Sequence, residues 1–271
     1  MNASPRPAVA VPGLVTRADD AGLNVATNEG IRIAVENGIA RNVSVLALGS
    51  ALDDAAERLR DLDACFGFHA CLNAEWADPC WGPLTVHRRL VDARGMLPAT
   101  WEGLRELNPQ PDVVIAEMTA QLSRLRGTGL PIRYMDEHMG FSAALPDLRL
   151  ALEEFARREG LIYRMDLPGL PVAPGEEAFS EGDHSGRFLH RLQAVSQGTW
   201  LVIAHPAIDS PEMRSVRMAG QAHGEVAADR CRQALMFISQ EILTYCSSRP
   251  VRLMRYDDLD TPDRAATTAA V

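Results

Sequence analysis

The stretch VTRADDAGLN (residues 15–24) places two adjacent aspartates between an apolar segment and the start of a helical pattern. Neighbouring carboxylates repel each other, so such a pair is stable only beside water, hydrogen-bond donors or cations. One interpretation is a solvated turn or a helix N-cap, where aspartate is common. The other is that Asp19 and Asp20 divide two tasks, holding a metal ion and accepting a proton.

Short apolar segments alternate with amphipathic ones along the chain. Helical patterns occupy residues 51–62, 112–127 and 146–160, and an earlier one carries an apolar face that stops at Gly38. The segments typical of buried strands are VPGLVTRA (11–18), NVSVLALG (42–49), CFGFH (65–69), PIRYMD (131–136), GLIYRMD (160–166), TWLVIAH (199–205) and PVRLMRY (250–256). This alternation indicates an α/β protein with a mostly parallel sheet. About seven such units without a break predict one deformed (β/α) barrel.

We expect a single domain over residues 1–258 and a disordered tail over residues 259–271, which are small and polar. Two segments rich in proline and glycine, residues 74–108 and 166–186, are too long for simple connections. Loops of that length usually cover functional sites.

The composition excludes several classes of protein. A net charge of −9 argues against nucleic acid or an acidic membrane surface as the partner. Five cysteines without CxxC spacing indicate reduced thiols rather than a disulfide framework. The first residues lack a signal-peptide pattern, and no apolar segment is long enough to span a membrane. The sequence therefore predicts a cytoplasmic protein.

Polar residues recur where the predicted strands end. They are, in chain order, Asp19, Asp20, His69, Asp136, His138 and His205. Each one alone has a simpler explanation, since a single histidine beside an apolar segment is usually a core or surface residue. In parallel α/β folds, however, the carboxyl ends of the strands meet at one rim, so we expect these side chains to converge. Such a set can hold a divalent ion and move protons, which suits metal-assisted hydrolysis of an amide.

Five stretches match a known family in order and over nearly the whole chain. They are ADDAGLNVATNEGI (18–31), GFHACLN (67–73), YMDEHMGF (134–141), LVIAHPA (201–207) and VRLMRYDDL (251–259). The sequence thus resembles the YdjC/ChbG family of carbohydrate deacetylases, relatives of the NodB-type polysaccharide deacetylases. The resemblance implies a deformed (β/α) barrel that removes the acetyl group of an N-acetylated amino sugar.

The resemblance also implies roles for the polar residues at the strand ends. Asp20, His69 and His138 would bind one divalent metal ion. Asp19 would be the general base and His205 the general acid. Asp136 would orient a metal ligand from behind. Zn²⁺ suits two imidazoles and a carboxylate best, with Mg²⁺, Mn²⁺ and Co²⁺ as alternatives.

Two other functions stay open at this point. A metal-dependent phosphoesterase could use the same rim, although the sequence has no glycine-rich phosphate loop. A sugar-binding barrel without activity is the second, but it would need neither Asp19 nor His205. The sequence leaves the oligomeric state open, with a homodimer as one alternative.

The substrate contacts are expected in the long loops and beside His138. Trp76 and Trp81 either stack on a sugar ring or form a hydrophobic cluster that pins the loop. Glu75 and Glu137 are further candidates, and carboxylates crowd the expected rim: Glu75, Asp78, Glu137, Glu176, Glu177, Glu181 and Asp183. These acids are either a solvated surface or the source of a negative field that favours cations.

A negative field would favour an N-acetylated sugar that already carries amino groups, such as an aminoglycoside-type or other secondary-metabolite oligosaccharide. A neutral chitin oligosaccharide such as diacetylchitobiose is the alternative. In either case the expected partner is a small amino sugar or oligosaccharide.

Overall fold

The computed structural model describes residues 11–259. Its main sheet contains the seven predicted strands, and their pairings are parallel. The strands are β1 (Gly13–Ala21), β2 (Asn42–Val45), β3 (Cys65–Ala70), β5 (Ile132–Glu137), β6 (Ile162–Tyr163), β7 (Thr199–Ala204) and β9 (Arg252–Met254). Residues 260–271 of the predicted tail lie outside the described part.

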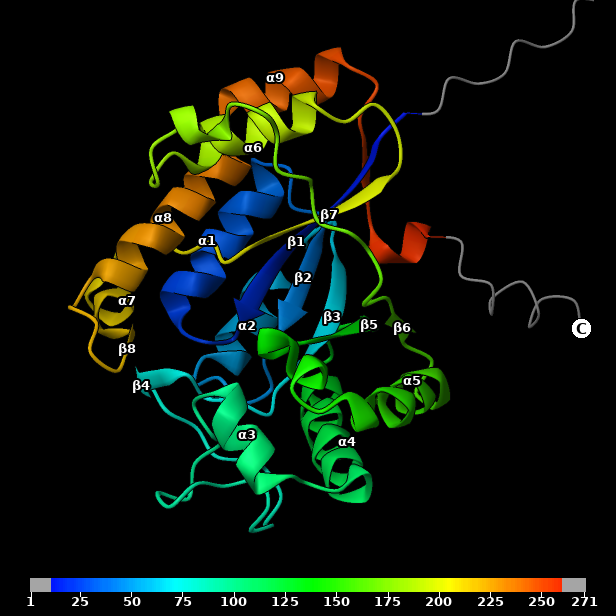
Figure 1. Ribbon diagram of the computed structural model, residues 1–271, viewed down its shortest axis with the longest axis vertical. Helices are drawn as coiled ribbons and strands as arrows, with labels where there is room; N and C mark the ends of the chain where they lie inside the picture. The colour runs from blue at the N-terminus through cyan, green and yellow to red at the C-terminus, as the bar shows by residue number, and fades with distance from the viewer. Residues whose placement is uncertain (1–10, 260–271) are drawn as a thin grey trace, which may run out of the picture.

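The sheet curls into an incomplete barrel. Its strands follow the order β6-β5-β3-β2-β1-β7, and β9 pairs with the first half of β1. The segment that follows the edge strand β6 reaches the other edge strand, β7, where Gly169 forms a parallel bridge with Leu201 and the Leu201 N–H donates to the Pro168 carbonyl at 2.8 Å. The prediction of a deformed (β/α) barrel is therefore confirmed. Figure 1 shows β1, β2 and β3 side by side with their arrowheads at the same end.

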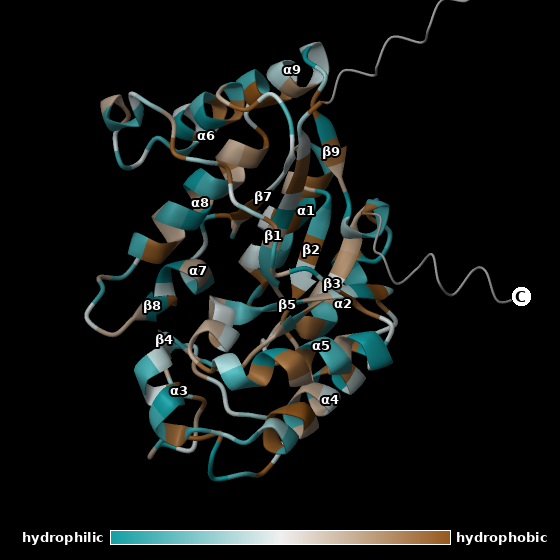
Figure 2. Ribbon diagram, turned by 45° about the vertical axis from the view of Figure 1, so that its right-hand side comes forward, coloured by the Kyte–Doolittle hydropathy of each residue, from teal (hydrophilic) through white to brown (hydrophobic). Residues whose placement is uncertain are grey.

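Helices surround this sheet, and Figure 2 shows hydrophilic and hydrophobic residues mixed along each of them, as one buried face requires. The α-helices are α1 (Val25–Glu36), α2 (Leu52–Leu59), α3 (Trp101–Leu107), α4 (Pro111–Gly127), α5 (Arg149–Arg158), α6 (His184–Gln193), α7 (Pro211–Ser215), α8 (Glu225–Phe237) and α9 (Gln240–Ser248). Short 3₁₀ helices are η1 (His138–Ala143), η2 (Pro146–Leu148), η3 (Glu176–Ala178) and η4 (Tyr256–Asp258). No helix between residues 11 and 259 is long and apolar enough to cross a membrane.

The long segments hold structure that the sequence did not reveal. Residues 74–108 contain α3 and the short strand β4 (Trp76–Asp78), which pairs antiparallel with β8 (Arg217–Met218). Strands of two or three residues are too short to show an alternating pattern, so this ribbon was not predictable. The ribbon brings the region after β3 beside the region before α8.

Strand β1 is irregular where the paired aspartates lie. In a regular strand Asp19 and Asp20 would point to opposite faces. The pairing of β1 with β2 shifts between Ala18 and Ala21, and Asp20 has a left-handed φ of 70°. A bulge of this kind re-aims a side chain at a cost of order 1–3 kcal/mol. As a result both aspartates line one pocket.

Asparagines fix the turn that follows the aspartates. Asn24 is the N-cap of α1, and its side chain accepts a hydrogen bond from the Thr27 N–H at 2.8 Å. Asn28 accepts from the Gly22 N–H at 2.7 Å and donates to the Ala51 carbonyl at 3.0 Å. All of these contacts are buried, so they hold the β1–α1 turn in one position.

Helix α1 also packs against the segment that follows β7. A Cβ atom on Gly30 would lie 2.4 Å from the Ala207 Cα, so only glycine allows this approach. His205 is two residues before Ala207. The contact therefore sets the position of His205 relative to the end of β1.

Candidate active site

An open pocket of about 600 Å³ lies at the carboxyl ends of the strands. Five of the six polar residues singled out in the sequence line it: Asp19, Asp20, His69, His138 and His205. The sixth, Asp136, is buried behind His69. The convergence expected from the strand ends is therefore present.

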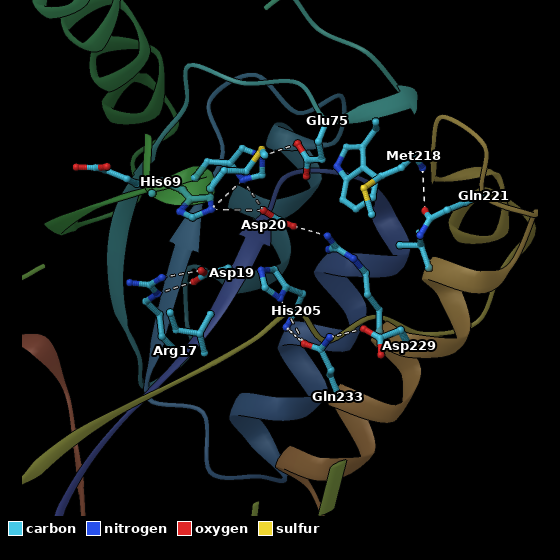
Figure 3. Close-up of a pocket in the computed structure, with 18 of the residues that line it drawn as sticks. Arg17, Asp19, Asp20, His69, Glu75, His205, Met218, Gln221, Asp229 and Gln233 are labelled. Atoms are coloured by element: carbon cyan, nitrogen blue, oxygen red, sulfur yellow. Dashed lines mark hydrogen bonds and ion pairs between the residues drawn. The ribbon is translucent and has the colours of Figure 1, made fainter. Parts of the chain in front are cut away.

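Three donor atoms gather at one point of this pocket. The Asp20 Oδ1 atom lies 3.5 Å from the His69 Nε2 atom and 3.4 Å from the His138 Nδ1 atom. The two imidazole nitrogens are 3.2 Å apart. All three side chains are buried, and Figure 3 shows Asp20 and His69 turned toward each other.

The spacing of these atoms fits a small divalent ion. Four ligands at about 2.0–2.1 Å from a tetrahedral ion are separated by about 3.3 Å, close to the three distances observed here. The Asp20 Oδ1 atom is buried and has no hydrogen-bond partner within residues 11–259. A buried carboxylate oxygen without a partner is costly unless something else binds it. The donor set therefore fits a metal ion.

Carboxylates orient both imidazoles from behind. The His69 Nδ1 atom lies 2.8 Å from Asp136 Oδ1, and these residues are paired in the register of β3 and β5. The His138 Nε2 atom lies 2.7 Å from Glu75 Oε2. Each contact leaves one defined nitrogen facing Asp20, as is typical for histidines that bind metals. Glu75, considered above as a substrate contact, thus binds His138 of the Asp20–His69–His138 cluster.

The charges of the cluster support one another. Burial of Asp20 acts to raise its pKa, but Arg230 and the two imidazoles outweigh burial and hold the pKa well below its usual range. Burial acts to lower the pKa of His69, but Asp136 and Asp19 outweigh it and raise this pKa to about 9. Glu75 likewise raises the pKa of His138 well above its usual value, against the effect of burial. Asp136 and Glu75 therefore each favour the charged form of the imidazole that they contact.

Asp19 has different neighbours from Asp20. Arg17 donates to both oxygens of Asp19, at 2.7 and 2.8 Å, and its Nη1 atom lies 2.7 Å from Asp136 Oδ2. Arg17 and Asp19 are two residues apart on one strand, so they share a face. The two hydrogen bonds, drawn as dashed lines in Figure 3, hold the Asp19 carboxylate in a fixed orientation beside the Asp20–His69–His138 cluster.

His205 follows β7 and is held by α8. Its backbone N–H donates to the Gln233 side-chain oxygen at 2.6 Å, and its Nδ1 atom lies 3.4 Å from the same oxygen. The Gln233 amide group in turn donates to Asp229 at 2.6 Å, which fixes the orientation of the amide. Burial lowers the pKa of His205. Figure 3 places His205 between Asp19 and Gln233.

The residues expected to contact substrate are divided by the structure. Trp76 and Glu137 line the pocket, as Glu75 does. Trp81 does not line it, because its ring packs in the hydrophobic core and its indole N–H donates to the Asn73 carbonyl at 3.0 Å. These are the contacts that the interpretation as a pin of the loop predicts for Trp81.

Most of the expected acidic rim lies elsewhere. Of the seven carboxylates named in the sequence, five do not line the pocket: Asp78, Glu176, Glu177, Glu181 and Asp183. Glu176, for example, is ion-paired with Arg191. Two acids that the sequence did not single out, Glu225 and Asp229, line the pocket from α8. They are four residues apart, which places them on one face of that helix.

Three further residues hold the polar site and were not among the predicted site residues. They are Arg17, Arg230 and Gln233. The i, i+2 spacing of Arg17 and Asp19 was a usable signal. Arg230 and Gln233 lie on α8, more than 200 residues from Asp19 and Asp20, and no spacing rule connects them.

A family model described as "YdjC-like protein" matches residues 13–248. The chain belongs to the YdjC-like family. The match covers six of the seven barrel strands, all but β9, and every pocket residue named above. The resemblance seen in the sequence is thereby confirmed.

Known proteins of similar sequence and fold extend this result. A carbohydrate deacetylase from Vibrio cholerae serotype O1 (strain M66-2) is 24% identical over 260 residues, which cover 95% of this chain and 97% of that protein. A crystal structure from Enterococcus faecalis V583, of a protein described provisionally as a cellobiose-phosphate cleavage protein, superimposes with a TM-score of 0.74. That structure is 19% identical and covers 93% of this chain and 100% of its own, so it shows the shared fold.

Proposed function

We propose that this protein is a metal-dependent N-deacetylase, which hydrolyses the acetamido group of an N-acetylated amino sugar to acetate and a free amine. The convergence of Asp20, His69 and His138 around one unpartnered oxygen is the observation that carries the proposal. The near full-length similarity to a protein named carbohydrate deacetylase supports the same reaction.

Asp20, His69 and His138 would hold the ion, with Zn²⁺ the best suited and Mg²⁺, Mn²⁺ or Co²⁺ as alternatives. When bound, such an ion polarises the acetyl carbonyl and lowers the pKa of water. Asp136 and Glu75 keep the two imidazoles in the orientation that presents the correct nitrogen. These contacts let the chain position its ligands before any substrate arrives.

Proton transfer is assigned to Asp19 and His205, the other two predicted site residues that line the pocket. Asp19, held by Arg17, would accept the proton of the attacking water as general base. His205 would donate a proton to the departing nitrogen, so that the amine leaves in neutral form. The lowered pKa of His205 makes its protonated form a stronger acid toward that nitrogen. Water and the amide are thereby converted to acetate and the amine.

The pocket favours a substrate that already carries an amino group. Six carboxylates line it, Asp19, Asp20, Glu75, Glu137, Glu225 and Asp229, against the two arginines Arg17 and Arg230. Four of the six lie in or beside the metal and proton-transfer residues. Glu225, on the α8 side, lies outside that set and would attract an ammonium group, whereas Asp229 accepts from Gln233 and lies 3.0 Å from His184 Nε2. An aminoglycoside-type or other amino-bearing oligosaccharide is therefore proposed over neutral chitin oligosaccharides.

The test is loss of one acetyl group, followed by mass spectrometry, across N-acetylated aminoglycosides, N-acetylglucosamine and diacetylchitobiose. Release of acetate that stops with a chelator and returns with Zn²⁺ is expected. The aminoglycoside preference should shrink as ionic strength rises, because salt screens the carboxylates. Activity that a chelator leaves intact would contradict the metal proposal. A neutral sugar that is preferred at every salt concentration would contradict the substrate proposal alone.

A further inference from the structure

Arg230 is a buried cation with an unusual set of neighbours. Its side chain is 5% exposed, and its guanidinium lies over the Trp76 ring at 5.2 Å. Its Nη2 atom donates to Asp20 Oδ2 at 2.6 Å. The Nη1 atom is buried without a hydrogen-bond partner within the described residues. Asp20 is therefore the residue that this side chain binds through a hydrogen bond.

The contact divides the two oxygens of Asp20. Oδ2 is occupied by Arg230, whereas Oδ1 is the atom that faces His69 and His138. A carboxylate can bind a divalent ion through one oxygen or through both. With Oδ2 held at 2.6 Å by a guanidinium, only one oxygen of Asp20 is available to an ion.

We propose that Arg230 is a positioning residue that restricts Asp20 to binding the metal through one oxygen, which keeps coordination positions open for water and the acetyl oxygen. This inference rests on the metal site of the proposed function. An ion held by two imidazoles and a two-oxygen carboxylate would have one open position fewer. Hydrolysis needs room for both reactants, so the restriction favours turnover rather than tight metal binding.

The chemistry of arginine suits this task. Its planar guanidinium stacks on an aromatic ring and stays charged when buried. Stacking on Trp76 fixes the plane of the group, and charge-assisted hydrogen bonding fixes Asp20. The same positive charge lies close to the metal site, where it weakens binding of a cation. Arg230 therefore lowers the affinity of the site for metal, which an uncharged structural residue would not do.

The experiment uses Co²⁺ as the probe with the full chain, because the visible absorption of Co²⁺ weakens as its coordination number rises. We expect Arg230→Met to bind Co²⁺ at least as tightly as the unmodified protein, with weaker absorption. Its kcat should fall about 10–100-fold on the sugar that the acetyl-loss test above shows to be a substrate, which is the usual effect of residues behind a metal ligand. Arg230→Lys keeps the charge and a donor, so it should restore most of the absorption.

Arg232→Met is the matched control, since Arg232 lies on the same helix and is exposed. It should leave the Co²⁺ affinity, absorption and kcat unchanged. An Arg230→Met protein that loses Co²⁺ affinity in step with its melting temperature would overturn the proposal, as would one with unchanged absorption and kcat. If Arg230→Met does not fold, Arg230→Lys decides, and loss of Co²⁺ affinity there also overturns it. A wrong metal site would give a different result. In that case His69→Ala would leave the Co²⁺ absorption of the protein unchanged.

Discussion

Asp19 and Asp20 are adjacent in the chain, yet each carboxylate is held by a different arginine. Arg17 binds both oxygens of Asp19, at 2.7 and 2.8 Å, whereas Arg230 binds one oxygen of Asp20 at 2.6 Å. The two cations offset the repulsion between the neighbouring carboxylates. The free oxygen of Asp20 faces both imidazoles, whereas a carboxylate oxygen of Asp19 lies within 4.8 Å of a ring nitrogen of His69 and of Asp136. These different contacts predict different effects of the same substitution.

Replacing each aspartate by asparagine tests that division. Asp19→Asn should retain the metal and lower kcat by about 10²–10⁴, the usual scale of general acid–base catalysis. Asp20→Asn should release the metal, because the amide lacks the charge that the ion needs. Bound metal is measured by elemental analysis after dialysis, and kcat by acetate release. Equal metal loss in the two variants would show that the roles are divided wrongly.

Substitutions of His69, His138 and Glu75 should weaken metal binding to different degrees. His69→Ala and His138→Ala should each abolish stoichiometric metal binding, since each removes one of three ligands. Glu75→Gln should weaken binding by about 10–100-fold, because His138 loses only the partner that orients it. His223→Ala is a suitable control, as this histidine is exposed and lies outside the cluster. Stoichiometric metal in either alanine variant would exclude the proposed ligand set.

The site was predictable from the sequence as far as strand ends define it. His69, Asp136 and His138 end neighbouring parallel strands, so their meeting follows from the topology alone. The strand ends alone did not predict that Asp19 and Asp20 line the same pocket, because the regular alternation of a strand would have pointed them to opposite faces. The bulge at Asp20, with its φ of 70°, depends on tertiary contacts of the turn and leaves no clear pattern in the sequence.

The far wall of the pocket was not predictable in the same way. Arg230 meets Asp20 across 210 positions of sequence, and the contact depends on how α8 is rotated against the barrel. For the acidic loops the sequence predicted a feature that the structure does not have. Their composition predicted carboxylates around the pocket, but Glu176, for example, pairs with Arg191 and does not line the pocket. Charge along a loop does not fix where its side chains point.

The raised pKa values of the imidazoles predict how pH affects the metal-free protein. His69 has a folded pKa of about 9 against an ordinary value of 6.5. Its protonated form therefore contributes stability that is complete below about pH 6.5 and is lost as pH rises through about 9. The chelated protein should lose about 2–6 °C in Tm between pH 7 and 10, at roughly 2 °C for each kcal/mol. The His69→Ala protein should show a smaller change, and an identical pH dependence in the two would contradict the assignment.

The two tryptophans of the long loop make a matched pair for the last prediction. Both rings pack in the hydrophobic core, but Trp76 also lines the pocket under Arg230, whereas Trp81 donates its indole N–H to the Asn73 carbonyl. Both are equally buried, at 6% and 7% exposure, so burial alone predicts similar losses of stability on substitution by leucine. We expect Trp81→Leu to cost about 2–4 kcal/mol of unfolding free energy while leaving KM unchanged.

Trp76→Leu should instead raise KM by about 5–10-fold, equivalent to roughly 1 kcal/mol of contact between an aromatic ring and the substrate. Its effect on Tm should be smaller than that of Trp81→Leu, because one side of the ring faces the pocket rather than the core. Thermal unfolding and acetate release, measured on the same samples, separate the two effects. If Trp76→Leu lowered Tm as much as Trp81→Leu and left KM unchanged, Trp76 would be a support for Arg230 alone, and the sugar would be held by the α8 side of the pocket.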